Sequence, residues 1–186
     1  DLKAYLLSCS LLKKINEKEI DYIKYIVDNQ IDKIGMHKSY NFLEHSKFIN
    51  NLSEIKNILL FFNSKKSNIF DEVILKMTSI LNEYFHLDGT LALFNGTNNV
   101  YTINIYNSLN KESYLKKREF SNINNGIAFY SDKNKKIFFD VVQPNSDMIS
   151  SNLSAGTLSV ELSGFGEKIL TNCGASESFG KNPEYL

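Results

Sequence analysis

The hydrophobic pattern of this chain changes its period near the middle, at Asp88 and Gly89. Before this point apolar residues recur every three or four positions, which is the spacing of one face of an α-helix. After it, apolar and polar residues alternate in several segments, and asparagine and glycine clusters separate these segments, as expected for strands joined by turns. A chain that runs from helices into strands predicts an α+β fold in two parts.

Four apolar stripes predict helices in the first half, and they run from Leu2 to Leu12, Ile20 to Ile34, Phe48 to Phe62 and Phe70 to Phe85. Asn68 is the expected N-cap of the fourth helix, because its side chain can accept hydrogen bonds from the free amides of the first turn. The segment between Gly35 and Asn41 is expected to be a loop. Helices joined by short loops pack as antiparallel hairpins, either in a bundle or in a toroid of hairpins.

The second half predicts strands at Tyr101–Ile105 and at Ile137–Val142, the latter buried on both faces. The clearest alternation runs from Thr157 to Ser163, where Leu158, Val160 and Leu162 point to one side of the strand, and Ser159, Glu161 and Ser163 to the other. Gly164-Phe165-Gly166 then predicts a hairpin turn into residues 167–173, with glycines supplying the positive φ angles. We therefore divide the chain into a helical part, residues 1–90, and a β part, residues 91–186.

The composition restricts the partners of the protein. Lysine plus arginine equal aspartate plus glutamate, at 21 each, and this balance argues against a dedicated nucleic-acid surface. No apolar run approaches the ~20 residues of a membrane-spanning helix, and no signal peptide is visible at residues 1–12. The chain begins at Asp1 without methionine, so we expect a piece of a longer protein. Two distant cysteines predict neither a disulfide framework nor a metal site.

Three histidines are the simplest candidates for acid–base chemistry near neutral pH, namely His37, His45 and His86. His37 lies in the predicted loop, and His45 follows eight residues later, so the pair could line one groove. His86 is expected to cap or follow the end of the fourth helix, where a cation suits the helix dipole. The alternative is that all three are ordinary surface or half-buried histidines. No metal-ligand spacing and no serine nucleophile motif occurs, and no cofactor is predicted.

Three segments resemble the bacterial heparinase II/III-like polysaccharide lyases. Gly35–His37, with Asn41 and His45, is similar to the DGxH segment of the family. Leu87–Gly96 reads LDGTLALFNG and resembles the stretch that precedes the β-sandwich in a proteobacterial subgroup. Ser154–Ser163, with Leu170–Gly174, resembles the HAGxLSFELS and IVNCG hairpin of that subgroup. The resemblance implies the last part of an α/α toroid of helical hairpins over residues 1–90, followed by an incomplete antiparallel β-sandwich over residues 91–186.

The resemblance also implies an activity, which is cleavage of uronate-containing anionic polysaccharides by β-elimination in the periplasm or envelope of a Gram-negative bacterium. His37 and His45 would then be catalytic, with His37 touching the substrate or neutralising its carboxylate, and Asn95 would bind substrate at the cleft. No metal or cofactor is implied at these positions. The HxHxD segment of the family falls at Asn152–Gly156 and lacks both histidines and the aspartate.

Two other functions stay open. A noncatalytic glycan-binding or scaffold protein on the same fold would account for the missing HxHxD groups. A helical-toroid glycoside hydrolase would need two carboxylates facing one cleft, and no convincing pair can be nominated from the sequence. The oligomeric state is not indicated by any pattern in the sequence.

Overall fold

A computed structural model describes residues 17–62, 65–97, 120–124, 126–141 and 158–172. Its helices are α2 (Glu17–Asn29), α3 (Phe42–Phe61) and α4 (Asp71–Glu83). Its strands are β1 (Phe120–Asn124), β2 (Ile127–Ser131), β3 (Lys135–Asp140), β4 (Val160–Gly164) and β5 (Glu167–Leu170). The predicted α+β class is therefore confirmed. The predicted helix over residues 2–12 and strand over residues 101–105 lie outside the described residues.

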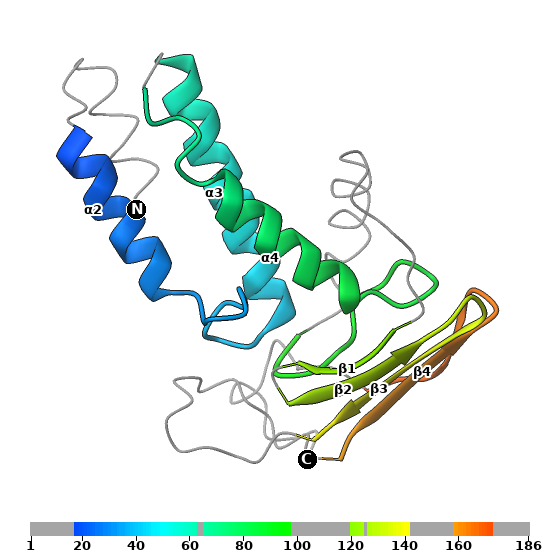
Figure 1. Ribbon diagram of the computed structural model, residues 1–186. Coiled ribbons are helices and arrows are strands. Elements are labelled where there is room, and N and C mark those ends of the chain that lie inside the picture. Colours follow the sequence, from blue (N-terminus) through cyan, green and yellow to red (C-terminus); the bar gives the residue numbers. More distant parts are fainter. Residues whose placement is uncertain (1–16, 63–64, 98–119, 125, 142–157, 173–186) are drawn as a thin grey trace, which may run out of the picture.

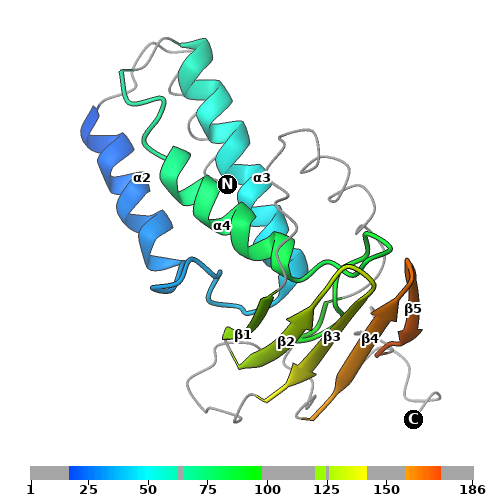
Figure 2. The same cartoon turned by 45° about the vertical axis from the view of Figure 1, so that its right-hand side comes forward.

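The three helices stand side by side and alternate in direction, with the end of α4 directed toward the sheet (Figures 1 and 2). Helix α3 begins where Asn41 caps it, because the side-chain oxygen of Asn41 accepts a hydrogen bond from the Glu44 amide. The predicted cap of α4 at Asn68 is wrong. Phe70 is the N-cap and makes no side-chain cap bond, while the backbone carbonyl of Asn68 accepts from the Asp71 amide.

Helix α2 is shorter than its apolar stripe, because a tight turn begins at Asp32. The carboxylate oxygen Oδ1 of Asp32 accepts hydrogen bonds from the backbone amides of Ile34, Gly35 and Met36. A short acidic side chain that satisfies several backbone donors competes with the helix and ends it. Gly35 occupies this turn with φ of +99°, a conformation that a side chain disfavours. The loop predicted between Gly35 and Asn41 is therefore confirmed.

The five described strands form one antiparallel sheet in the order β1-β2-β3-β4-β5, so that strands that follow one another in the sequence also pair in the sheet. The hairpin predicted between β4 and β5 is confirmed, with Gly164 paired to Glu167. Its positive φ angles belong to Phe165, at +53°, and to Gly166, at +87°. Phe165 therefore takes the conformation that the sequence assigned to Gly164, because the two residues at the tip of a tight hairpin both require positive φ.

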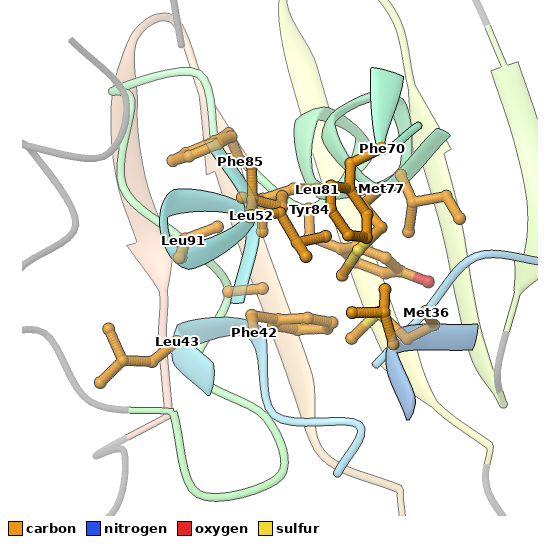
Figure 3. Packing of buried hydrophobic residues seen from close by; sticks show 14 of the residues in the cluster. Met36, Phe42, Leu43, Leu52, Phe70, Met77, Leu81, Tyr84, Phe85 and Leu91 are labelled. Carbon is orange, nitrogen blue, oxygen red and sulfur yellow. The ribbon is translucent and has the colours of Figure 1, made fainter. Parts of the chain in front are cut away.

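One face of the sheet packs against the helices and closes a core that both parts share. Phe138 in β3 is fully buried, and its ring lies 6.2 Å from that of Tyr84, which follows α4. Tyr84 stacks in turn on Phe42 at the start of α3, with ring centroids 4.2 Å apart (Figure 3). The prediction that β3 is buried on both faces is only partly right, because Ile137 on its other face is half-buried.

The alternation predicted for β4 is confirmed, and its polar side is the one that faces the helices. Glu161 and Ser163 are buried, whereas Val160 and Leu162 are half-buried and Leu158, just before the strand, is 67% exposed. Polar side chains on a core-facing sheet surface require hydrogen-bond partners, because an unpaired buried polar group is costly. Those partners come from the connection that follows α4, at His86, Leu87 and Leu93, and from the residues after β5.

The described part of this connection, residues 84–97, is called the linker below. Its first part doubles back as a short hairpin, in which the His86 amide donates to the Thr90 carbonyl at 2.7 Å and the Ala92 amide to the Tyr84 carbonyl at 3.0 Å. The carboxylate of Asp88 accepts from the amide and hydroxyl of Thr90 and stabilises the turn. The linker lies between the helices and the sheet (Figure 2), and its Thr97 hydroxyl accepts from the Phe42 amide at the start of α3.

Candidate functional site

His45 lies in the first turn of α3 and is completely buried. Its Nδ1 accepts a hydrogen bond from the His37 amide at 3.0 Å, and its Nε2 lies 2.9 Å from the carbonyl of Met77 in α4. A carbonyl can only accept, so the hydrogen-bond network assigns the proton of the neutral ring to Nε2. Both ring nitrogens are thereby used, and His45 fixes the backbone at His37.

Burial lowers the pKa of His45 to about 4, although the Met77 carbonyl favours the charged form. A proton added to Nδ1 would also point at the His37 amide, which is itself a donor. The ring is therefore neutral at physiological pH, and the geometry gives His45 a positioning role on the loop that carries His37.

The side chain of His37 is half-buried and lies at the same loop. Its Nδ1 accepts from the Ser39 amide at 3.2 Å and lies 2.8 Å from the Ser39 hydroxyl, and its ring packs against Phe48 with centroids 5.0 Å apart. Burial lowers the pKa of His37, and the nearby Glu44 carboxylate opposes this effect. Because Nδ1 is an acceptor, the neutral ring carries its proton on Nε2, and no described residue hydrogen bonds to that atom.

Asn95 reaches this loop from the linker, 55 residues away in sequence from Tyr40. Its side-chain amide donates to the Tyr40 carbonyl at 3.1 Å, and its backbone carbonyl accepts from the side-chain amide of Asn41 at 2.9 Å. Tyr40 and Asn95 both have positive φ, at +53° and +52°. Non-glycine residues in this conformation are uncommon, and they persist where the surrounding structure holds them.

The structure thus brings two of the three sequence-predicted site residues, His37 and Asn95, to one pair of interlocked loops, with His45 beneath them. Nε2 of His37 and the side-chain oxygen of Asn95 have no hydrogen-bond partner in the described part of the chain. Together they offer one N–H donor and one acceptor, which is a pair suited to hydroxyl and carboxylate groups. Whether either residue touches a substrate stays a prediction.

His86 follows the end of α4, as predicted, but its side chain does not face solvent. It is buried, and its Nε2 lies 2.7 Å from Oε2 of Glu161 in β4. Glu161 was not nominated from the sequence. The available signal was its place within SVELS, on the polar side of an otherwise clear strand alternation.

A hollow of about 300 Å³ lies between α2, α4 and the turn at Gly35. Its lining carries three lysines and three acidic residues: Lys24, Lys33, Lys76, Asp28, Asp32 and Glu72. Lys24 pairs with Asp28, and Lys76 donates to the Lys33 carbonyl. The lining is balanced in charge, so it has no preference for an anionic ligand. Among the described residues no group of three or more histidine, cysteine, aspartate or glutamate side chains could hold a metal ion.

No helix in the described ranges is long and apolar enough to cross a membrane. A comparison with curated proteins finds no match. Residues 117–185 match a family model described as heparinase II/III-like, C-terminal.

The fold is similar to that of two solved enzymes. The crystal structure of heparinase III matches with a TM-score of 0.75 at 13% identity, covering 92% of this chain and 33% of the other. The heparan sulfate lyase HepC from Pedobacter heparinus matches with a TM-score of 0.64 at 14% identity, covering 83% of this chain and 28% of the other. The chain spans about a third of the length of these proteins. The resemblance to heparinase II/III-like proteins is confirmed.

Proposed function

Because this chain resembles heparinase II/III-like lyases in sequence and in fold, we propose that it is part of a polysaccharide lyase. The substrate is a uronate-containing anionic glycan, cleaved by β-elimination, and the protein works in the periplasm or envelope of a Gram-negative bacterium. In this reaction a base removes the proton α to the uronate carboxylate, polar groups stabilise the resulting anion, and an acid protonates the leaving oxygen. Such a reaction needs positioned donors where negative charge develops.

The observation that carries the proposal is the interlocking of two motifs. Asn95 of the LALFNG segment donates from its side chain to the Tyr40 carbonyl in the loop that follows Gly35, and the Asn41 side chain donates back to the backbone carbonyl of Asn95. Residues more than fifty positions apart are thereby held in one pair of loops, which also carries His37. Preorganisation of this kind is what stabilises a charged transition state, because no reorganisation is needed when the charge appears.

The roles follow from the hydrogen bonds. His37 donates from Nε2 to the uronate carboxylate, whose negative charge grows as the α proton leaves. His37 is not the proton-abstracting base in this scheme, because its Nδ1 is occupied by the Ser39 amide. Asn95 orients a sugar hydroxyl through its side-chain oxygen. His45 contributes by holding the amide of His37 and touches no substrate.

The second candidate is a noncatalytic glycan-binding protein on the same fold. It is favoured by one sequence observation, which is that Asn152–Gly156 has neither the histidines nor the aspartate of the HxHxD segment. On this proposal the donor on His37 and the acceptor on Asn95 bind an anionic sugar, and no bond is cleaved.

The test is to incubate the full-length protein with a panel of uronate-rich polysaccharides and to follow near-ultraviolet absorbance, since β-elimination creates a conjugated unsaturated uronate. The variants are His37→Ala and His37→Gln, because a glutamine amide can still donate from a similar position. Lys133→Ala, in the exposed turn before β3, is the control.

We expect activity in the wild type and in the control, loss in His37→Ala, and partial retention in His37→Gln. Absence of the chromophore together with saturable glycan binding would favour the noncatalytic protein. A new reducing end without unsaturation would instead indicate hydrolysis.

A further inference from the structure

Glu161 is a fully buried carboxylate in β4, between β3 and the edge strand β5. Its Oε2 accepts from Nε2 of His86 at 2.7 Å, the Leu93 amide lies 3.2 Å from both carboxylate oxygens, and the Asn172 amide donates to Oε1 at 3.0 Å. Burial alone would raise the pKa of Glu161, but the hydrogen bonds from His86 and Asn172 hold it below the usual range. The carboxylate is therefore ionised, and donors from two separate segments converge on it.

A buried charge of this kind contributes little to stability compared with an apolar side chain of similar volume. The neighbour of Glu161 on β3 is Phe138, whose ring meets that of His86 edge-on at 4.9 Å. An apolar residue would avoid the desolvation cost, but it would leave the donors of His86, Leu93 and Asn172 without their acceptor. What the carboxylate adds is geometry, because it binds both arms of the linker hairpin, at His86 and at Leu93.

The strands on either side of β4 also form hydrogen bonds with the linker. Lys136 of β3 donates to the Phe85 carbonyl at 2.7 Å, and Lys168 of β5 lies 3.4 Å from the Leu91 carbonyl. Between them, the hydroxyl of Ser163 accepts from the Leu87 amide at 3.4 Å. Lys136, Ser163 and Lys168 are cross-strand neighbours, so a polar row of the sheet runs beneath the linker hairpin and binds its backbone.

The path from Glu161 to the candidate site is short. Leu93, which the carboxylate binds, is two residues before Asn95, and Asn95 donates to the Tyr40 carbonyl. The Tyr40 amide in turn donates to the His37 carbonyl at 2.9 Å. One covalent segment and two hydrogen bonds therefore connect Leu93 to the residue proposed to contact substrate.

We infer that Glu161 is a positioning residue, which holds the linker so that Asn95 and the His37 loop keep their mutual geometry. This inference rests on the proposed function for its catalytic consequence, but the positioning itself can be measured without any activity. Displacement of a catalytic group by about 1 Å can lower a rate on the order of a hundredfold.

The main experiment compares Glu161→Gln with Glu167→Gln in the full-length protein. Glu167 is exposed at the start of β5 and is the matched control. Hydrogen exchange is measured on peptides covering residues 37–45 and 91–97, with α2 as the internal reference. In Glu161→Gln we expect exchange to accelerate at least tenfold in both peptides, with α2 unchanged. We also expect kcat to fall on the order of a hundredfold with KM little changed, since a misplaced catalytic group weakens binding of the transition state more than binding of the substrate.

A second pair of variants keeps the carboxylate, in case Glu161→Gln does not fold. His86→Gln retains a side-chain donor for Glu161, whereas His86→Leu removes it. Faster exchange at residues 91–97 in His86→Leu and near-normal exchange in His86→Gln would support the inference. Equal exchange in the two variants, or uniform acceleration that includes α2, would overturn it. A wild-type protein without lyase activity would refute the proposed function alone, because the exchange result stands independently.

Discussion

The buried His45 makes the folding stability of the protein depend on pH in a specific window. The folded-state pKa is about 4, against 6.5 for an ordinary histidine, because burial disfavours the imidazolium. Between these two values the unfolded chain binds a proton at His45 and the folded chain does not. Stability linked to this residue is therefore fully present above pH 6.5 and is lost as the pH falls toward 4.

The size of the effect follows from the difference between the two pKa values. Each pKa unit corresponds to about 1.4 kcal/mol, so the loss on acidification is about 3 kcal/mol. The variant His45→Gln does not titrate, and its amide can still donate to the Met77 carbonyl. Comparing the free energy of urea unfolding of the wild type and the variant at several pH values cancels the carboxylates that titrate in the same range.

We expect the stability advantage of the wild type over His45→Gln to shrink by about 3 kcal/mol as the pH falls from above 6.5 to 4. An independent check is an NMR titration of the ring, which should find the Nε2–H tautomer and a pKa near 4. A ring that titrates near 6.5, or a stability difference that is flat across this window, would refute the assignment of His45 as a neutral residue bridging His37 and Met77.

Three further predictions concern other positions. Gly35→Ala should lower the free energy of unfolding by about 1–2 kcal/mol, because φ is +99° there and a Cβ would lie 2.8 Å from Cγ of Lys76. An unchanged midpoint in a urea titration would contradict this prediction. Phe165→Asn should raise the free energy of unfolding by about 0.5–1 kcal/mol, because Phe165 is 87% exposed with φ of +53° and asparagine tolerates this conformation. A lower thermal midpoint for this variant would argue against a type I′ turn at the hairpin tip. Burial lowers the pKa of Lys136 to about 8, so between pH 8 and 10.5 the unfolded chain holds a proton at this residue that the folded chain has lost. The free energy of unfolding of the wild type should therefore rise over this range by about 3 kcal/mol relative to Lys136→Met, and parallel curves of stability against pH for the two proteins would show that the amine is well solvated.

The order of elements could be predicted from the sequence because it depends on local periodicity. The 3.6-residue stripes located α2, α3 and α4, and the two-residue alternation located β4, with boundaries that shifted where side chains bind the backbone. The turn at Asp32 and the cap at Phe70 show the limit of this reasoning. Which side chain satisfies a helix end depends on rotamers and neighbours that apolar spacing does not encode.

The sequence by itself determined that helices precede strands, that a loop carries His37, and that a glycine-flanked hairpin joins β4 and β5. These features rest on contacts between residues close together in the chain. Only the tertiary structure decided that Asn95 meets the His37 loop, that His45 is neutral between two backbone groups, and that Glu161 binds the linker. Those outcomes depend on desolvation and on hydrogen bonds between residues from 8 to 75 positions apart, and neither is expressed in local periodicity.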